Sequence, residues 1–342
     1  MPSISIIIPT HNRGELLMQT IASVQAQTNR DFECVVVDDH STDDTASRMQ
    51  AVLDTDSRFT MISVPSGRRG AQAARNIGIE RAKGDYVMLL DSDDLLAPHC
   101  IEQRIAVMQS NPQLDFVVFP CECFIKQPGD VSLLWNVQTS EPDLDRFLKG
   151  DVPWQTTSPI WKRDAIVSLL PWPEDVPVAQ DWEFHIRALA RRMQYARFGS
   201  VDHYWRQAES ERESIGKNSF KPELLRGRVG VNERVLKIIK DAGLLSDTYR
   251  DYLAGLFWQS AERVAQRVSR KEARLIWQKA HDLGLIKAAQ LKQGRNYLLL
   301  ARFARLHPHL LARLKRHWPA SFFVTRSATY LKSPVPRQIE SV

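Results

Sequence analysis

The sequence has few cysteines, no long apolar run and no acidic residue over a long stretch near its C-terminus. Its four cysteines are too few and too irregularly spaced for a disulfide scaffold, and no CxxC pair offers a zinc site. No run of 18 apolar residues occurs, so we expect no membrane-spanning helix. The N-terminus has no basic segment ahead of an apolar one, so no signal peptide is visible and the cytoplasm is the expected location.

The missing acids create a charge asymmetry. From Gly284 to Gln338 there is no Asp or Glu but there are eleven Lys and Arg residues. Removing those eleven from the 46 Lys and Arg residues leaves 35 against the 40 Asp and Glu residues, so the rest of the chain is mildly acidic. We call residues 284–338 the basic C-terminal segment. Such a segment favours an anionic partner. A lipid surface, a nucleic acid and an acidic polymer are the three candidates.

The apolar residues of this segment separate two interpretations. Leu298, Leu299, Phe303 and Leu306 recur at helical spacing among the arginines. Basic and apolar faces together favour a helix that lies on an anionic membrane surface, at the inner face of the membrane. A nucleic acid would satisfy the charge but not the apolar face, so we consider it an unlikely partner. An ordinary core-packing helix with a solvated cationic face explains the same pattern.

What is present is the composition of a folded protein. The 342 residues are 43% hydrophobic and 25% charged, which excludes a disordered or fibrous chain and suggests two domains. The first 120 residues alternate β-branched runs with helical patterns, which predicts an α/β fold with a mostly parallel sheet flanked by helices. Strands are expected at 5–9, 32–37, 59–64 and 85–90, and helices at 13–27, 43–53, 71–83 and 99–109. Ser41 or Thr42 is the expected cap of the second helix.

The pattern changes twice further along. From about residue 120 to residue 177 prolines interrupt the periodicity, and after about residue 221 it becomes helical. We therefore predict an α/β domain over residues 1–218, with a nucleotide-binding half (1–120) and an acceptor half (121–218). Residues 219–342 are expected to form a helical and basic C-terminal region.

Acidic clusters follow two of the predicted strands. Asp91 and Asp93 come directly after a buried strand, where both carboxylates can converge on one Mg²⁺ or Mn²⁺ ion. A turn that caps the next helix explains the same residues. Asp39 also follows a strand, and its carboxylate can accept hydrogen bonds from a base or a ribose, although helix capping is again an alternative. In parallel sheets such strand ends are where ligands bind.

A third segment runs from Gly67 to Gly78 and places small residues and arginines, among them Arg75, at a predicted helix start. Backbone amides and guanidinium groups in this arrangement suit a phosphate. The segment is neither GxGxxG followed by an acid nor GxxxxGK[ST]. Dinucleotide-binding and P-loop interpretations therefore fail.

Four segments in this order resemble the family 2 inverting glycosyltransferases, which have the GT-A fold. The matching segments are Ser5-Ile-Ile-Ile-Pro-Thr-His-Asn-Arg13, Val36-Val-Asp-Asp-His-Ser-Thr-Asp-Asp-Thr45, Ala74-Arg-Asn-Ile-Gly78 and Gly84-Asp-Tyr-Val-Met-Leu-Leu-Asp-Ser-Asp-Asp94. The resemblance covers roughly residues 1–210. It implies a nucleotide-sugar donor, usually linked to UDP, and a divalent metal ion, Mn²⁺ or Mg²⁺.

The resemblance also assigns residues. Asp39 is placed at the uracil or ribose, Asp91 near the ribose as the first acid of the DxD motif, and Asp93 on the metal, which Asp91 can share. His11 stands where the family often has Tyr, and His40 where Gly is commoner. The complete set of expected donor-binding residues is Pro9, Thr10, His11, Asn12, Asp39, Arg75, Asn76, Asp91, Ser92 and Arg206.

The expected catalytic base comes later in the chain. In the family a Glu-Asp pair opens a helix, and the matching residues here are Gln180 and Asp181. An acceptor hydroxyl must lose its proton as it attacks the anomeric carbon, so one carboxylate in reach is needed. A helix N-cap is the alternative role of Asp181. Arg206 is a candidate diphosphate ligand or a surface ion pair. The side chains of Trp154, Trp172 and Trp182 are candidate stacking platforms for an acceptor sugar or ordinary core residues.

The predicted function is therefore the transfer of a sugar from a nucleoside-diphosphate donor to a glycan or lipid-linked acceptor, as in the synthesis of cell-surface polysaccharides. A sugar nucleotidyltransferase is the enzymatic alternative, because it shares the parallel sheet and the acidic metal site. A non-catalytic adaptor that binds membrane or nucleic acid through its basic segment is the other alternative.

Overall fold

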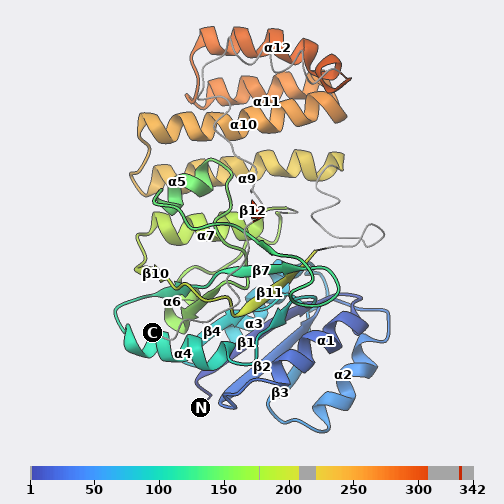
Figure 1. Cartoon of the computed structure of the whole chain (residues 1–342). Coiled ribbons are helices and arrows are strands. Elements are labelled where there is room, and N and C mark those ends of the chain that lie inside the picture. Colours follow the sequence, from blue (N-terminus) through green and yellow to red (C-terminus); the bar gives the residue numbers. More distant parts are fainter. Residues whose placement is uncertain (1, 177, 208–220, 307–330, 333–342) are drawn as a thin grey trace.

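The computed structural model describes residues 2–176, 178–207, 221–306 and 331–332 (Figure 1). Two sheets and the helices around them occupy one end of the molecule, and the last helices stack at the other. The strands are β1 (Ile4–Thr10), β2 (Phe32–Asp38), β3 (Phe59–Ser63), β4 (Tyr86–Leu89), β5 (Leu95–Leu96), β6 (Phe116–Val118), β7 (Cys121–Phe124), β8 (Leu133–Leu134), β9 (Pro159–Lys162), β10 (Tyr195–Arg197), β11 (His203–Arg206) and β12 (Leu331–Lys332). The helices of the first two hundred residues are α1 (Gly14–Gln25), α2 (Thr45–Leu53), α3 (Ala71–Arg81), α4 (Cys100–Ser110), α5 (Asp143–Leu148), α6 (Arg163–Ser168) and α7 (Gln180–Ala190).

The main sheet has seven strands in the order β10-β6-β9-β4-β1-β2-β3. Its neighbours pair in parallel except β9, which runs antiparallel to both β4 and β6. The predicted α/β fold with a mostly parallel sheet is confirmed. The four predicted strands and four predicted helices of the first 120 residues are present, with ends that differ by a few residues. The prediction that Ser41 or Thr42 caps α2 is wrong, because the N-cap residue is Asp44 and its side chain forms no cap hydrogen bond. The Ser41 hydroxyl donates to Asp38 instead, and the carboxylate of Asp43 accepts the Thr45 amide at 3.1 Å.

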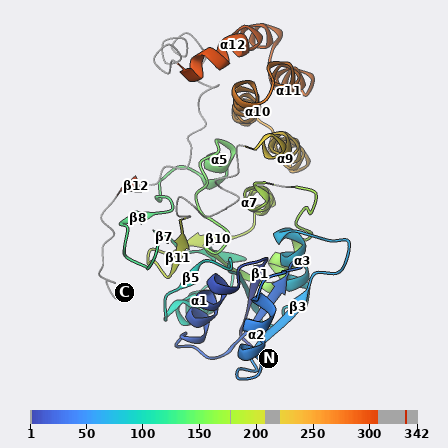
Figure 2. The same cartoon turned by 90° about the vertical axis from the view of Figure 1, so that its right-hand side faces the viewer.

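A second sheet of five short strands, β12-β8-β7-β11-β5, lies over the first and has no counterpart in the sequence prediction. Figure 2 shows its strand β5 next to α1. Its strands are two to four residues long, too short to produce a recognisable alternation of polar and apolar residues. Cys121 and Cys123 lie on β7, and both are buried free thiols.

The main sheet is buried on both faces, as its uninterrupted β-branched strands predict. Ile4, Ile6 and Ile8 of β1 pack in a cluster with α1 and α4, whereas Ile7 belongs to a second cluster with α3 and α7. Gly78 of the Ala74–Gly78 motif allows α3 to approach β1 closely. A Cβ atom at this position would lie 2.2 Å from Cγ2 of Ile7, so any larger residue would push the helix away from the strand.

A fully buried ion pair joins α4 to the start of β11. The guanidinium of Arg104 donates to both carboxylate oxygens of Asp202 at 2.7 and 2.8 Å, and it also donates to the carbonyl of Thr157. Burial opposes ionisation of Asp202, but the charge and hydrogen bonds of Arg104 lower the carboxyl pKa to about 2. Folding lowers this pKa, so the stabilisation is present above the unfolded value of about 3.9 and is lost as pH falls toward 2.

The C-terminal helices are α9 (Pro222–Asp241), α10 (Asp247–Arg267), α11 (Arg270–Asp282) and α12 (Ala288–Leu306). They stack one on another from α7 outward (Figure 1). Apolar residues of these helices, such as Val231 and Trp258, belong to the same buried cluster as Ile7 of β1 and Trp182 of α7. The apolar core is therefore continuous from the sheet to α12.

The described part of the basic C-terminal segment packs largely as a core helix. Leu298 is fully buried in the stack, where Tyr297 also contacts Trp258, so Leu298 is unavailable to a membrane. Leu299 is 43% exposed, and Lys287, Lys292 and Arg295 are exposed as well. Phe303 and Leu306 have side chains outside the described part, as do all basic residues of the segment after Arg295. In the described residues, no helix combines the length and the apolar character that crossing a bilayer requires.

Asp202→Asn should be strongly destabilising, because it leaves the Arg104 guanidinium buried without its counter-ion. We expect a loss of about 3–5 kcal/mol in the free energy of unfolding. Asp241→Asn, which removes the exposed partner of Lys237 on α9, is the matched control and should change it by less than about 0.5 kcal/mol. Urea unfolding followed by tryptophan fluorescence measures both. Equal unfolding midpoints for the two variants would show that the buried Arg104–Asp202 pair stabilises the fold no more than an exposed ion pair does.

Candidate active site

The register of the sheet brings the predicted polar clusters to one edge. Thr10 at the end of β1 pairs with Asp38 at the end of β2, and β4 runs parallel to β1 on its other side. The Asp39 amide donates to the Thr10 carbonyl at 2.8 Å, and the Leu90 amide donates to the Ile7 carbonyl at 2.9 Å. The loops after β1, β2 and β4 therefore start side by side.

The first loop is bound to the second through His11 and Asn12. The His11 ring contacts the Asp39 carbonyl through Nδ1 at 2.5 Å. The Asn12 side-chain oxygen accepts the Thr42 amide at 2.7 Å, and its backbone amide donates to the Ser41 hydroxyl. Asn12 thus holds the two loops in register, while the exposed His11 ring is the group that a ligand can reach. Pro9 and Thr10 are buried in β1.

Asp39 has one committed and one unused carboxylate oxygen. Its Oδ2 accepts the Gly70 amide at 2.7 Å, which ties it to the start of α3. Its Oδ1 is buried, and so is the Thr10 hydroxyl, and neither has a hydrogen-bond partner among the described residues. Buried polar atoms without partners are uncommon in folded proteins and often mark ligand sites. His40 has φ of 58°, the left-handed conformation that explains a preference for glycine at this position.

Asp91 and Asp93 are each paired with an arginine. Arg75 of α3 donates to Asp91 at 2.7 Å, and Arg13, just before α1, lies 2.5 Å from Asp93. Burial raises the pKa of the Asp93 carboxyl, the charge of Arg13 opposes this shift, and the charge of Asp91 adds to it. Arg13 was missed by the sequence prediction. The signal for it is weak, since an arginine after a Thr-His-Asn turn has no distinctive spacing.

Asp94 and Arg206 hold the loop over residues 91–94 in place through buried hydrogen bonds. Asp94 is buried and accepts the Arg206 amide at 3.0 Å, while the Arg206 guanidinium donates to the Asp93 carbonyl and to Gln19. Burial, together with the charges of Asp93 and Asp91, raises the Asp94 pKa well above its usual range. Arg206 is 7% exposed, so the alternative of a surface ion pair is wrong. Ser92 is buried between the two acids that flank it.

The acids fit a metal ion that arrives with a diphosphate. Asp91 and Asp93 keep 31% and 24% of their side chains exposed, so both carboxylates can reach a ligand. Among the described residues, no group of three or more His, Cys, Asp or Glu side chains could hold a metal ion. Mg²⁺ and Mn²⁺ sites in nucleotide enzymes commonly use one or two carboxylates and take further ligands from phosphates and water.

Asp181 lies in the first turn of α7, one residue inside the helix, so it is not the N-cap that the alternative proposed. Its Oδ1 accepts the Trp182 amide at 2.8 Å. Burial raises the pKa of the Asp181 carboxyl, the Trp182 bond and the charge of Arg75 lower it, and the charge of Asp91 raises it. Arg75 and Asp91 are therefore close enough for their charges to act on the Asp181 carboxyl.

Two groups of predicted residues have other roles. Asn76 is buried and uses its side-chain amide on the loop before α7, where it donates to the Trp172 carbonyl and accepts the Trp172 amide. Trp154, Trp172 and Trp182 are at most 2% exposed, so they are core residues and cannot stack on an acceptor sugar. Arg75 lies over the Trp172 ring, and its Nε and Nη1 atoms are buried without a partner in the described part of the chain.

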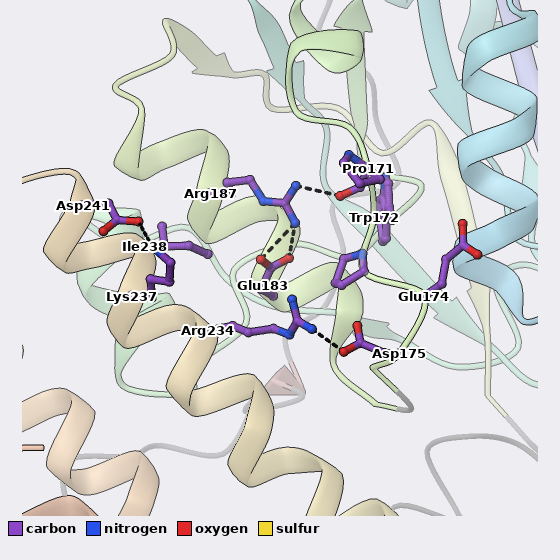
Figure 3. Close-up of a pocket in the computed structure, with 11 residues that line it drawn as sticks. Pro171, Trp172, Glu174, Asp175, Glu183, Arg187, Arg234, Lys237, Ile238 and Asp241 are labelled. Atoms are coloured by element: carbon purple, nitrogen blue, oxygen red, sulfur yellow. Dashed lines mark hydrogen bonds and ion pairs between the residues drawn. The ribbon is translucent and has the colours of Figure 1, made fainter. Parts of the chain in front are cut away.

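A pocket of about 640 Å³ opens near this region between α7, α9 and the loop over residues 171–175 (Figure 3). Most of its charged residues pair with one another: Arg187 with Glu183, Arg234 with Asp175, and Lys237 with Asp241. Trp172 lines it, but none of the predicted donor-binding, metal-binding or catalytic residues does. We therefore place the active site at the sheet edge rather than in this pocket.

Residues 5–163 match the family described as glycosyl transferase family 2. Residues 5–163 are therefore similar to the family 2 glycosyltransferases, and we call this region the family 2 domain. A Campylobacter jejuni enzyme, GalNAc(5)-diNAcBac-PP-undecaprenol beta-1,3-glucosyltransferase, is 34% identical over 143 residues, which are 42% of this chain and 45% of that protein. The first curated relatives are matched over less than half of their own length, between 44% and 48%.

Solved structures are similar in fold to most of this chain. Residues 1–349 of Staphylococcus aureus TarS in complex with UDP align with a TM-score of 0.57 at 17% identity, covering 88% of this chain and 87% of that one. The mannosyltransferase PcManGT from Pyrobaculum calidifontis, in complex with GDP-Man and Mn²⁺, aligns with a TM-score of 0.52 at 19% identity, covering 90% and 88%. The fold is therefore that of the GT-A glycosyltransferases.

Asp93→Asn tests the metal site. We expect Mn²⁺ to raise the affinity of the parent for UDP. The change removes one carboxylate charge from a loop and should leave the fold intact, but the variant should lack most of that gain. We expect that gain to fall at least about tenfold. Calorimetric titration of UDP with and without Mn²⁺ measures it. Asp44→Asn, at an exposed aspartate paired with Arg48, is the control and should behave as the parent. Full Mn²⁺ dependence in Asp93→Asn would place the metal elsewhere.

Proposed function

We propose that the protein is a metal-dependent inverting glycosyltransferase that moves a sugar from a nucleoside-diphosphate donor, with UDP as the nucleotide, to a glycan or lipid-linked acceptor. The observation that carries the proposal is that the loops after β1, β2 and β4, which hold Asp39, Asp91 and Asp93, start side by side at one edge of the sheet in the family 2 domain. The effect of the Asp91 charge on the Asp181 carboxyl supports adding Asp181 to this set. The names of similar proteins support the substrate classes. One acts on an undecaprenol-linked glycan, and TarS has been crystallised with UDP and with UDP-GlcNAc.

The donor would lie along the edge formed by the loops after β1, β2 and β4. The free oxygens of Asp39 and Thr10 would bind the base or ribose, with the His11 ring beside them. Asp91 and Asp93 would hold Mn²⁺ or Mg²⁺, which neutralises charge on the donor diphosphate. Arg75 has two unused guanidinium nitrogens and would bind the diphosphate directly, with Ser92 and Arg206 supporting the loop. Pro9, Asn12 and Asn76 would position these groups through the contacts described above.

The acceptor hydroxyl would attack the anomeric carbon from the side opposite the leaving diphosphate. As the new C–O bond forms, the bond to the diphosphate oxygen breaks and the nucleoside diphosphate departs with that electron pair. Asp181 would take the hydroxyl proton. Its raised pKa, caused mainly by burial, makes it a stronger base than an exposed aspartate, and the influence of Arg75 and Asp91 on it supports a position next to the donor.

Asp181→Asn should abolish most turnover. The amide is nearly isosteric and keeps an oxygen for the Trp182 amide, but it cannot take the proton. We expect kcat to fall about 10²–10⁴-fold with little change in donor affinity. Release of UDP from UDP-sugars, with detection of the glycosylated product, measures turnover, and formation of pyrophosphate instead would indicate a nucleotidyltransferase.

The control for this experiment is Asp164→Asn, an exposed aspartate in the first turn of the neighbouring helix α6. It should retain parental turnover. Near-normal turnover in Asp181→Asn would reject Asp181 as the base and leave it a purely structural residue of α7.

We also propose that the protein sits at the inner membrane face through its basic C-terminal segment. Three of the eleven basic residues, Lys287, Lys292 and Arg295, have side chains that the structure describes on or beside α12, and all three are exposed. Leu299 is exposed beside them. Each Lys or Arg near an anionic surface contributes on the order of 1 kcal/mol to binding, so even part of the segment suffices for reversible association.

Reversing the charges of Lys287, Lys292 and Arg295 to Glu should weaken binding to vesicles of phosphatidylglycerol at least about tenfold, because three attractions become repulsions. Vesicle co-sedimentation measures it, with phosphatidylcholine vesicles as the neutral surface. The same reversal at Arg81, Lys83 and Arg163, which are exposed on the family 2 domain, is the control. Equal binding by both variants, or binding to neutral vesicles alone, would contradict the proposal.

A further inference from the structure

The Asp93 carboxylate is bound by a single arginine side chain. Nη1 of Arg13 lies 2.5 Å from Oδ2 of Asp93, and in the described residues this carboxylate forms no other ion pair or hydrogen bond. The loop backbone is bound separately. The Asp93 carbonyl accepts the Arg206 guanidinium at 2.8 Å, and the Asp94 amide donates to the carbonyl of residue 91 at 3.0 Å. The Asp93 carboxylate can therefore change its partner while the loop backbone stays bound.

Arg13 is packed differently from the other two arginines around this loop. Arg75 and Arg206 are buried, and the guanidinium group of each lies over an aromatic ring. The Arg13 side chain is 31% exposed, and the described part of the chain gives it no partner besides Asp93. Its guanidinium group can therefore leave Asp93 for another acceptor without breaking any apolar packing.

The backbone at Arg13 is fixed while its side chain is exposed. Arg13 is the N-cap residue of α1, and its carbonyl accepts the Leu17 amide at 2.8 Å. The next amide, that of Gly14, donates to the Asp43 carboxylate at 3.2 Å. The side chain thus extends from a point that is tied to α1 on one side and to the loop before α2 on the other. A change of partner by the guanidinium group needs no movement of either helix.

A divalent metal ion and the Arg13 guanidinium group compete for the charge of Asp93. The other acid of the site, Asp91, is already bound by Arg75. Among the described residues no group of three or more His, Cys, Asp or Glu side chains could hold a metal ion, so the site depends strongly on Asp93. Two cations bound to one carboxylate are close neighbours and repel each other even in water. The metal ion therefore binds tightly only when the guanidinium group turns away.

A nucleoside diphosphate removes this conflict. Phosphate oxygens commonly supply the remaining ligands of Mg²⁺ and Mn²⁺ in nucleotide enzymes. They also accept strong hydrogen bonds from guanidinium groups, so Arg13 has a new acceptor as it leaves Asp93. The metal ion and the diphosphate therefore each make the binding of the other more favourable. This is a coupling between two ligands, and it is equal in both directions.

We infer that Arg13 takes the place of the metal ion at Asp93, so that Mn²⁺ alone binds weakly and Mn²⁺ and the nucleoside diphosphate bind cooperatively. Arg13 is then a positioning residue of the donor site, which keeps the Asp93 carboxylate in position until the metal ion and the nucleotide arrive together. The inference rests on the proposed function, because it takes Asp93 as a metal ligand. It goes further by assigning the order of binding to a residue outside the predicted donor-binding set.

The test is a titration of the full chain with Mn²⁺ in the absence of nucleotide, measured by the loss of the electron paramagnetic resonance signal of free Mn²⁺. Arg13→Gln should bind Mn²⁺ at least about fivefold more tightly than the parent, because the competing charge is gone. A purely structural role of Arg13 predicts weaker binding instead. Arg13→Lys keeps the charge and should stay close to the parent. Arg48→Gln removes the same charge from an exposed arginine paired with Asp44 and is the matched control.

Two further titrations separate displacement from a general effect of charge. At saturating UDP, the gain in Mn²⁺ affinity that the nucleotide gives should be smaller in Arg13→Gln than in the parent by at least about fivefold. In the Asp93→Asn background, adding Arg13→Gln should change the Mn²⁺ affinity less than about twofold, because the carboxylate for which the two cations compete is absent. Unfolding curves establish that each variant is folded.

Three results would overturn the inference. The first is an unchanged, weaker or unmeasurable Mn²⁺ affinity in Arg13→Gln. The second is an equal gain in the Asp93→Asn background, and the third is an effect of UDP on Mn²⁺ affinity that is as large in Arg13→Gln as in the parent. Failure of the proposed metal site is separate, since it would appear as equal Mn²⁺ affinities of Asp93→Asn and the parent in the presence of UDP.

Discussion

Repulsion among acids is the constraint on which the rest of the candidate site depends. Asp91, Asp93 and Asp94 lie within four residues, and burial of Asp93 and Asp94 strengthens the repulsion by removing water. Such a loop keeps one shape only if each acid is separately bound. Arg75 binds Asp91, Arg13 binds Asp93, and the Arg206 amide binds Asp94. These three arginines come from α3, from the start of α1 and from β11, so the loop is a meeting point of distant parts of the chain.

This arrangement suits a site that binds an anion and a cation together. A nucleoside diphosphate is negative and a divalent cation is positive, so their arrival together changes the net charge little. The ion pairs of Asp91 and Asp93 are partly exposed and can exchange partners, whereas Asp94 and its contacts are buried and stay as they are. This edge of the sheet thus combines buried contacts that hold the loop with exposed carboxylates that can bind a ligand. A preorganised ligand site is expected to have this combination.

The sequence predicts much of the first half of the chain because its signals are local. Buried β-branched strands end in acids, and parallel pairing then brings Asp39, Asp91 and Asp93 to one edge without further information. The five-stranded sheet, the role of Arg13 and the contacts of Asn76 depend on segments far apart in sequence, such as residues 76 and 172. The tryptophans were ambiguous for a similar reason, since only the packing of α7 against its neighbours decides that Trp154, Trp172 and Trp182 are buried.

The continuous apolar core has a consequence for how this chain can be rearranged. Val231 and Trp258 of the C-terminal stack share one cluster with Trp182 of α7 and Ile7 of β1. A recombined protein that joined this family 2 domain to the helices of a relative would have to match the shape of the α7 surface as well as the joining point. Exchange at the boundary alone would leave large aromatic side chains facing water. We therefore expect the family 2 domain and the C-terminal helices to have evolved together. A substitution on one side of their apolar interface would favour a compensating substitution on the other side.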